Sequence, residues 1–355
     1  MTDKKRIVFV VNPISGTQGK KAILKWIDER LDRSIYDYSI VKTEYAGHAS
    51  QIAATAVQDN VDIVVAIGGD GTINEIARSL VHTDTALGII PCGSGNGLAR
   101  HLRIPMDAKS AIDILNQGNS VCIDYGKINN ILFFCTCGVG FDAFVSLKFA
   151  DSGKRGLLTY LENTLHESLT YQPETYEIEN EEGTVRHKAF LIACGNASQY
   201  GNNAYITPHA SLTDGLMDIT IMEPFTVLDV PSLSFQLFNK TLDQNSRIKT
   251  MRAKKIKIHR QHDGVMHFDG DPLMAGKELE VEIIPAGLHV IASPKKRTKE
   301  ESENLLQVIS NYFSGLHLKG EEMLAKRQSH LFELNRNLLG KLSKNKITSS
   351  NKNHG

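Results

Sequence analysis

The sequence lacks a long apolar stretch and holds only five cysteines. No run reaches the ~18 apolar residues that a membrane-spanning helix needs. The short apolar run near the N-terminus ends at Asn12-Pro13, too early for the core of a secretion signal. The cysteines stand in apolar or glycine-rich segments, which is typical of small buried side chains in a reducing compartment. We therefore expect a cytoplasmic protein.

An excess of charge of one sign is also missing. Lys and Arg together number 40, as do Asp and Glu, so the composition gives no reason to expect a nucleic-acid partner. The balance is uneven, because residues 294–355 contain 12 basic and 6 acidic residues. Basic amphipathic helices bind anionic membrane surfaces. We expect this segment to reach the inner membrane face, or to pack on the body of the protein or on a second subunit of a homodimer.

Several familiar catalytic motifs are absent. Gly16–Lys20 resembles a P-loop only superficially, because the spacing G-x-x-x-x-G-K-[ST] is not met. The 13 histidines include no H-E-x-x-H pair, and no G-x-S-x-G elbow occurs. These absences argue against a P-loop enzyme, a zinc peptidase and an α/β-hydrolase.

The chain of 355 residues suits two domains. Its first part alternates buried-type strands with amphipathic helices, which predicts a doubly wound parallel sheet in an α/β domain over residues 1–125. Strands are expected at 6–11, 38–43, 61–67 and 86–90, and helices at 21–31, 49–58, 72–80 and from 97 onward.

The rhythm then changes to strands separated by turn signals, which predicts an antiparallel β-sandwich over residues 126–293. Strands are expected at 121–127, 131–137, 174–180, 185–194, 217–222, 254–260, 265–268 and 278–284, and helices near 156–167 and 227–236. Residues 294–355 read as a helical C-terminal extension.

A glycine-rich segment, Gly68-Gly69-Asp70-Gly71-Thr72, follows a buried strand and opens a helix. Glycine lets backbone N–H groups approach a ligand, and a helix N-terminus adds unpaired donors and a positive dipole end. This combination suits a phosphate group. The Asp70 carboxylate then needs a cation nearby, which a Mg²⁺-bound nucleotide would supply.

Two more polar loops follow strands in the same domain. They are Pro91–Gly97, with the sequence PCGSGNG, and Asn12–Gly16, with the sequence NPISG. In a doubly wound sheet the loops at the carboxyl ends of neighbouring strands converge. We therefore expect all three to form one site.

These motifs resemble the signature of the diacylglycerol kinase catalytic domain, whose superfamily includes sphingosine, ceramide and bacterial lipid kinases. The resemblance covers roughly residues 5–292 and implies ATP and Mg²⁺ as cofactors. It also implies a set of nucleotide-binding residues: Asn12, Ser15, Gly16, Thr43, Gly68, Gly69, Asp70, Gly71, Thr72, Glu75, Gly93, Ser94, Gly95 and Asn96. The Gly-Ser-Gly-Asn form is closer to the sphingosine kinase branch.

The second domain supplies two carboxylates in His267-Phe268-Asp269-Gly270-Asp271. Phosphoryl transfer needs a base for the attacking hydroxyl. The segment is similar to the family's Asp-Gly-Glu motif, which implies that Asp269 and Asp271 are catalytic, together with Asp70 at the nucleotide. Asp271 replaces the usual Glu, which leaves open which of the two takes the proton. An ordinary Asp-Gly hairpin turn is the alternative.

Softer resemblances imply further residues. A turn similar to the family's structural Mg²⁺ site implies that Asp214 and the backbone carbonyls of Ser211 and Leu216 hold the ion, and a turn without metal is the alternative. Asp124 resembles a family residue near the substrate. Gly140 and Asp142 resemble the family's segment beside the acceptor cleft, and purely structural roles are the alternative for all three.

We therefore expect an ATP-dependent kinase that phosphorylates the hydroxyl of a lipid at a membrane surface, with a diacylglycerol or a sphingoid base as the acceptor type. A soluble-substrate kinase of the NAD kinase type shares the Gly-Gly-Asp-Gly loop, although the Gly-Ser-Gly-Asn loop is not expected there. A non-catalytic nucleotide- or membrane-binding module is the third reading, and the presence of both carboxylates argues against it.

Overall fold

A parallel sheet forms the core of the N-terminal lobe. The computed structural model describes residues 4–15, 19–152, 171–226 and 228–292. Four strands run parallel in the order β2 (Tyr36–Lys42), β1 (Lys5–Val11), β3 (Ile63–Gly68) and β4 (Ala86–Pro91). Every residue of β3 and β4 is buried, because helices cover both faces of the sheet.

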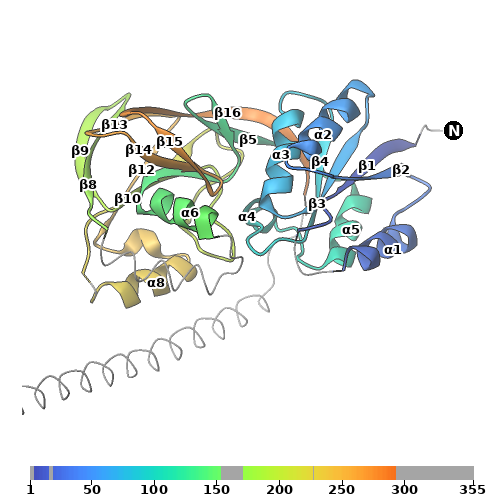
Figure 1. The fold of residues 1–355 in the computed structure, drawn as a ribbon, viewed down its shortest axis with the longest axis horizontal. Helices are drawn as coiled ribbons and strands as arrows, with labels where there is room; N and C mark the ends of the chain where they lie inside the picture. Colours follow the sequence, from blue (N-terminus) through green and yellow to red (C-terminus); the bar gives the residue numbers. More distant parts are fainter. Residues whose placement is uncertain (1–3, 16–18, 153–170, 227, 293–355) are drawn as a thin grey trace, which may run out of the picture. The chain divides into compact units, whose positions relative to one another are not determined.

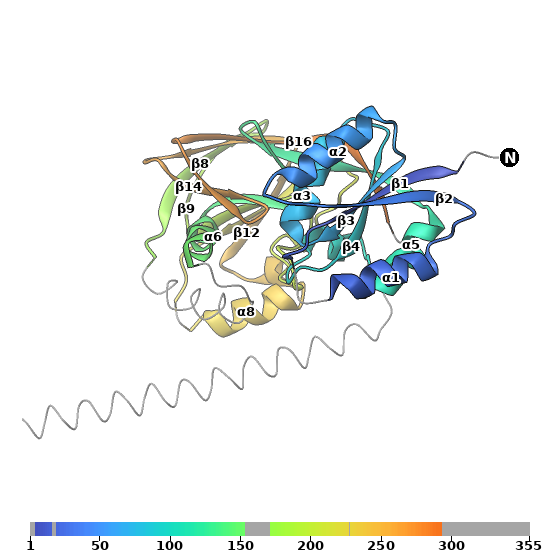
Figure 2. The same ribbon diagram turned by 45° about the vertical axis from the view of Figure 1, so that its right-hand side comes forward.

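The helices of this lobe lie on the two faces of the sheet. Figures 1 and 2 show α1 (Lys20–Arg30) and α5 (Ala108–Gln117) on one face and α2 (His48–Gln58) and α3 (Asp70–Leu80) on the other. In α3 the buried residues include Ile73, Ile76, Ala77 and Leu80, the spacing of one helical face. A short helix, α4 (Gly97–His101), follows the loop after β4.

The same sheet continues into the second lobe. The last strand, β16 (Glu278–Ile291), pairs in parallel with β4 at Val290 and Leu87 and is antiparallel to β5 (Ser120–Ile128). Beyond β16 the order is β13 (Lys255–Arg260), β8 (Glu174–Asn180) and β9 (Gly183–Ala189), while β6 (Ile131–Phe133) pairs with β5. The long β16 therefore joins the two lobes (Figure 1).

A second, six-stranded sheet packs on this extension. Its order is β12 (Ile248–Ala253), β11 (Met217–Met222), β10 (Leu191–Gly195), β7 (Thr136–Gly140), β14 (Gly264–Phe268) and β15 (Asp271–Ala275). Buried residues of both sheets, such as Ile178, Ile258, Val139 and Ile192, form one apolar cluster between them. This is the antiparallel sandwich that the sequence predicts.

Helices cover the outer face of the second sheet. A second apolar cluster joins α6 (Phe141–Ser152), α8 (Val230–Phe238) and the 3₁₀ turn Leu242–Gln244 through Phe141, Leu233 and Leu242. None of the helices in the described ranges is both long and apolar enough to cross a membrane.

The predicted fold class is confirmed, and the local corrections have physical causes. The expected strand 131–137 is two strands, β6 and β7, because the extended conformation is interrupted at Phe134-Cys135. The expected strand 185–194 divides at Phe190 into β9 and β10, which belong to different sheets. Helices α5 and α6 and strands β12 and β15 were not predicted.

Two predicted helical regions belong to segments outside the described residues. The helix expected near 156–167 and the whole extension at 294–355 lie outside the described residues. The expected boundary between residues 125 and 126 falls within β5, so the domain limits stay a prediction.

The contact between Gly126 and Phe133 yields a test of the packing of β5 on β6. A Cβ at Gly126 would lie 2.0 Å from the ring of Phe133, which is fully buried. We expect Gly126→Ala to reduce the free energy of unfolding by about 1–3 kcal/mol, because the ring has to move within a packed core. Urea denaturation measures the loss. Gly276→Ala, where a Cβ meets nothing within 4 Å, is the control and should change little.

Candidate active site

Two glycine loops at the carboxyl ends of β3 and β4 are fastened together by Asp70. Its carboxylate accepts hydrogen bonds from the backbone N–H groups of Asn96 (2.8 Å) and Gly97 (2.8 Å), at the start of α4. Burial raises the pKa of Asp70, and these hydrogen bonds oppose that shift. A Cβ on Gly93 would lie 2.7 Å from the Cα of Gly69, so the two backbones touch. Each Asp70 carboxylate oxygen therefore accepts a hydrogen bond from the loop after β4.

Polar side chains from the neighbouring strand ends lie beside these loops. The Asn12 side chain donates to the Thr72 hydroxyl (3.0 Å), and the Ser15 hydroxyl donates to the Asn12 carbonyl (3.1 Å). The Glu75 carboxylate accepts from the backbone N–H of Ala49 (3.2 Å) at the start of α2. The three predicted loops do gather at one edge of the sheet.

Other members of the predicted nucleotide set lie at the same edge. Thr43 is buried and its N–H donates to the Val11 carbonyl (2.9 Å), whereas Ser94 and Gly71 are exposed. A Cβ at Gly71 would meet no atom within 4 Å, so space is open at the first turn of α3. Gly16 lies outside the described residues.

Asp269 holds the turn between β14 and β15 in place. Its backbone has φ +51°. Its carboxylate accepts from three consecutive N–H groups, those of Phe134 (2.8 Å), Cys135 (2.7 Å) and Thr136 (3.1 Å). Burial raises the pKa of Asp269 to about 6, although these donors and Arg78 favour the ionised form. The interruption between β6 and β7 thus lies at the residues whose backbone N–H groups donate to Asp269.

The two lobes meet around the Cys135 thiol. A Cβ at Gly97 would lie 3.4 Å from the sulfur, which places the thiol against the loop that Asp70 holds. Burial raises the pKa of Cys135, and the carboxylates of Asp269 and Asp70 raise it further. Asp70 and Asp269, 199 positions apart in the numbering, therefore act on one sulfur atom.

Asp271 is the exposed member of the acidic pair. Partial burial raises the pKa of its carboxyl group, Arg78 lowers it, and Glu75 raises it. Both of these α3 residues belong to the first lobe. The Asp269–Asp271 turn therefore faces the helix that the glycine loop opens.

A loop of the second lobe also lies directly on Gly95. Gly201 has φ +131°, and a Cβ there would lie 3.0 Å from the Gly95 backbone. The Asn202 N–H donates to the Gly95 carbonyl (3.2 Å), as does the Arg100 side chain (2.9 Å). The second lobe thus fixes the conformation of the Gly93–Asn96 loop.

Asp142 forms a buried polar cluster behind the acidic turn. Its carboxylate contacts His267 Nε2 (2.9 Å), accepts from the Tyr200 hydroxyl (3.0 Å) and accepts from the Ala143 N–H (2.8 Å). Gly140, with φ +95°, makes the preceding turn, where a Cβ would lie 2.6 Å from the Phe190 carbonyl. The sequence analysis gave His267 no role, although it stands two residues before Asp269.

Asp124 is a buried clamp between distant segments. Its carboxylate accepts from the N–H groups of Gly215 (2.7 Å) and Ala286 (2.8 Å), and its own N–H donates to the Leu212 carbonyl (2.7 Å). These contacts tie β5 to the turn before β11 and to the bulge in β16. The described contacts of Asp124 are thus structural, and a substrate role stays a prediction.

The predicted Mg²⁺ turn does not have a free carboxylate. Asp214 pairs with the Arg252 guanidinium and accepts from the Leu216 N–H (3.1 Å), and the Ser211 hydroxyl faces Thr213. No group of three His, Cys, Asp or Glu residues able to hold a metal occurs in the described ranges. The Asp214 carboxylate thus already has an arginine partner, and a Mg²⁺ ion held by Asp214 with the carbonyls of Ser211 and Leu216 stays a prediction.

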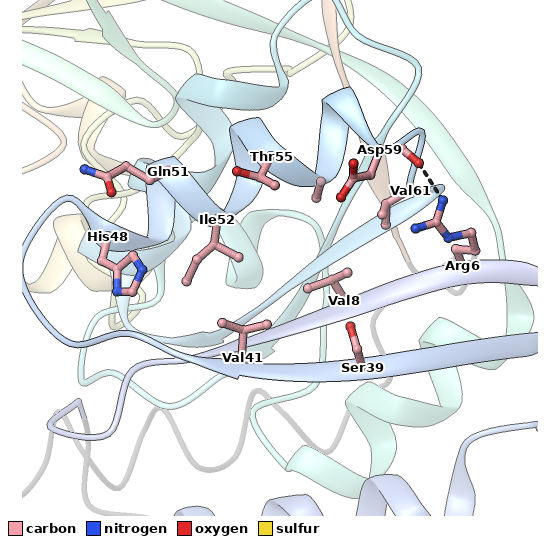
Figure 3. A pocket seen from close by; sticks show the side chains of 11 residues that line it. Arg6, Val8, Ser39, Val41, His48, Gln51, Ile52, Thr55, Asp59 and Val61 are labelled. Atoms are coloured by element: carbon pink, nitrogen blue, oxygen red, sulfur yellow. Dashed lines mark hydrogen bonds between the residues drawn. The ribbon is translucent and has the colours of Figure 1, made fainter.

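A separate pocket of about 400 Å³ lies between α2 and strands β1 and β2 (Figure 3). Val8, Val41 and Ile52 line it, with Arg6 and Asp59 at one end and His48 and Gln51 at the other. None of the predicted site residues lines it. The pocket is therefore separate from the site between the lobes.

The fold agrees with comparisons to known proteins. The family model of the diacylglycerol kinase catalytic domain matches residues 6–128, and that of the YegS C-terminal NAD kinase beta sandwich-like domain matches residues 135–292. A probable lipid kinase YegS-like from Klebsiella pneumoniae is 31% identical over 263 residues, which is 73% of this chain and 87% of the relative. The probable lipid kinase YegS of Escherichia fergusonii is 31% identical over 255 residues, with 70% and 84% covered.

Solved structures agree on the fold. A crystal structure of a diacylglycerol kinase from Bacillus anthracis str. Sterne has a TM-score of 0.66 at 19% identity, covering 83% of this chain and 99% of that one. The chain belongs to the diacylglycerol kinase catalytic-domain superfamily, in the family of YegS-like lipid kinases. The resemblance noted in the sequence is thereby confirmed.

Asp269 should make stability depend on pH. Its pKa in the folded protein is about 6, against an ordinary value of 3.8. The folded state therefore binds this proton more tightly, so the contribution is present below about pH 4 and is lost as the pH rises through 6. The shift corresponds to at most about 3 kcal/mol. The free energy of unfolding of the wild type, relative to Asp269→Asn, should decline between pH 4 and 7 in urea titrations. A difference that stays constant over this range would contradict the assignment.

Asp124→Ala tests the clamp. We expect a loss of stability of about 1–3 kcal/mol for each buried N–H group left without an acceptor. Asp37→Ala, at an exposed position of β2, is the matched control and should leave the thermal midpoint nearly unchanged. If Asp124 served only a substrate, both variants would unfold like the wild type.

Proposed function

We propose that this protein transfers the γ-phosphoryl group of ATP to the hydroxyl group of a lipid. The observation that carries the proposal is the meeting of the glycine loops held by Asp70 with the acidic turn held by Asp269, around Cys135. Membership of a family whose relatives are named lipid kinases supports it.

The nucleotide binds at the loops of the first lobe. The open first turn of α3 at Gly71 and the exposed loop residue Ser94 offer backbone donors to phosphate oxygens. The carboxylates that fit Mg²⁺ beside the phosphates are Glu75 and Asp271, since Mg²⁺ in such sites takes one or two carboxylates and the substrate oxygens. When bound, the ion neutralises charge on the phosphates.

Asp269 accepts the proton of the attacking hydroxyl. Its Oδ2 receives one backbone hydrogen bond and Oδ1 receives two, so Oδ2 keeps a lone pair for the substrate. A base works best when its pKa lies near the working pH, and burial brings the pKa of Asp269 to about 6. The three N–H donors fix the direction of the carboxylate.

Substitution of the acidic pair tests the assignment. We expect Asp269→Asn to lower kcat by about 10²–10⁴-fold with nucleotide binding retained, because a general base contributes this much. Asp271→Asn should weaken activity through the metal and the nucleotide. Transfer of label from γ-labelled ATP to a lipid extract measures both, and Asp263→Asn, in the exposed turn before β14, is the control. Near-normal turnover of both variants would refute the proposed chemistry.

The same assay separates the acceptors. Diacylglycerol, a sphingoid base and NAD⁺ are offered one at a time, since the second lobe matches a domain described as NAD kinase-like. Mass spectrometry of the labelled product identifies the acceptor. Label in NAD⁺ and in no lipid would replace the lipid kinase with the alternative of a soluble-substrate kinase.

A further inference from the structure

Arg78 lies at the junction of the lobes and has no part in the chemistry described so far. It belongs to α3, one turn beyond Glu75, and its guanidinium carbon lies 5.4 Å from the centre of the Phe268 ring. Phe268 ends β14 and immediately precedes Asp269. A cation of the first lobe thus stacks on the acidic turn of the second.

The guanidinium has no hydrogen-bond acceptor in the described part of the chain. Arg78 forms no ion pair there, and its Nη2 atom is buried without a partner. A guanidinium carries five N–H donors, and burying one unpaired is costly. Stacking on Phe268 occupies a face of the group and leaves its edges for an acceptor in its plane. The structure therefore presents donors for a ligand that it does not itself supply.

The charges around Arg78 define that ligand further. Its positive charge lowers the pKa of both Asp269 and Asp271, and Glu75 acts on Asp271 from the same helix. An anionic phosphate that enters this acidic site meets repulsion, which an unpaired guanidinium offsets. Arginine binds phosphate oxygens through two parallel hydrogen bonds.

The position of Arg78 along α3 indicates which phosphate group it could bind. Gly71, Glu75 and Arg78 share one helix face, at spacings of four and three residues. Arg78 lies about 12 Å along the axis from Asp70, at ~1.5 Å per residue, and its side chain extends back toward the helix start. Its guanidinium lies over the ring of Phe268, next to the acidic turn. This position suits the terminal phosphate or a phosphate of the acceptor.

We propose that Arg78 binds phosphate oxygens between the lobes, beside Asp269 and Asp271, and so helps to position the reacting groups. The proposal rests on the kinase function above. The phosphate is either the terminal one of ATP or, where the acceptor is a phospholipid in place of a diacylglycerol or a sphingoid base, one carried by its head group. The two sources share the same oxygen chemistry.

Direct binding measurements test this without relying on turnover. Calorimetry with ADP, with a non-hydrolysable ATP analogue, and with glycerol 3-phosphate in the presence of ADP is compared for the wild type, Arg78→Gln and Arg78→Lys. We expect Arg78→Gln to weaken one phosphate probe by about 10- to 100-fold, the range for charge-assisted hydrogen bonds, with ADP unchanged. Arg78→Lys should recover part of the loss, because it keeps the charge without the two-pronged geometry.

The control is Arg33→Gln. Arg33 also stacks on an aromatic ring, that of Tyr38 at 4.1 Å, but its guanidinium pairs with Asp28 and is half exposed. It should leave all three affinities unchanged. Urea unfolding of each variant shows whether any loss reflects folding alone.

The outcomes separate the two hypotheses. Weaker binding of the ATP analogue assigns Arg78 to the terminal phosphate, and weaker binding of glycerol 3-phosphate assigns it to the acceptor. Unchanged affinities for every probe, with nucleotide still bound, overturn the role of Arg78 and leave the kinase proposal standing. A wild type that binds neither ADP nor the ATP analogue overturns the kinase proposal itself.

Discussion

The arrangement of the site depends on the hydrogen bonds that the Asp269 carboxylate accepts. Three successive backbone N–H groups, from Phe134 to Thr136, donate to one carboxylate. That carboxylate belongs to a turn more than 130 residues later in the chain. The three N–H groups can do so only because β6 ends and β7 begins at that point. The same segment carries Cys135 against the α4 loop, so one break in a strand places the acidic turn opposite the glycine loops.

Asp70 and Asp124 use the same physical device in other places. Each buried carboxylate accepts two backbone N–H groups that no strand or helix satisfies, at the start of α4 and at the turns beside β5. A charged acceptor makes these bonds stronger than bonds between neutral groups. Loops that would otherwise have many conformations are thereby held in one, which is what a site that must position phosphates requires.

The carboxylates of the site differ in how many of their oxygens are already occupied by backbone N–H groups. The Asp269 carboxylate accepts three backbone hydrogen bonds and the Asp70 carboxylate accepts two. Asp271 is exposed, and the bond of Glu75 to Ala49 uses only one of its two carboxylate oxygens. Arg78 lies among these groups, and within the described residues its Nη2 atom has no hydrogen-bond partner. The junction therefore has both kinds of partner that a phosphate with its metal ion needs, carboxylates for the cation and a guanidinium for the oxygens.

The sequence by itself determined the alternation of buried strands with helices, the change to a sandwich, and the family, because glycine, buried runs and acidic turns each leave a local pattern. It located the loops and the acidic turn for the same reason. It did not reveal the breaks at Phe134 and Phe190, since those depend on which sheet a segment joins. Helix α5 was missed although Asp107 caps its start and Gly118 ends it, which are local signals. Nor could the sequence distinguish the carboxylates that bind backbone N–H groups from those left for ligands. It also gave no sign of the roles of His267 and Arg78, because the His267–Asp142 hydrogen bond and the contact of Arg78 with Phe268 join residues far apart in the chain and form only in the tertiary structure.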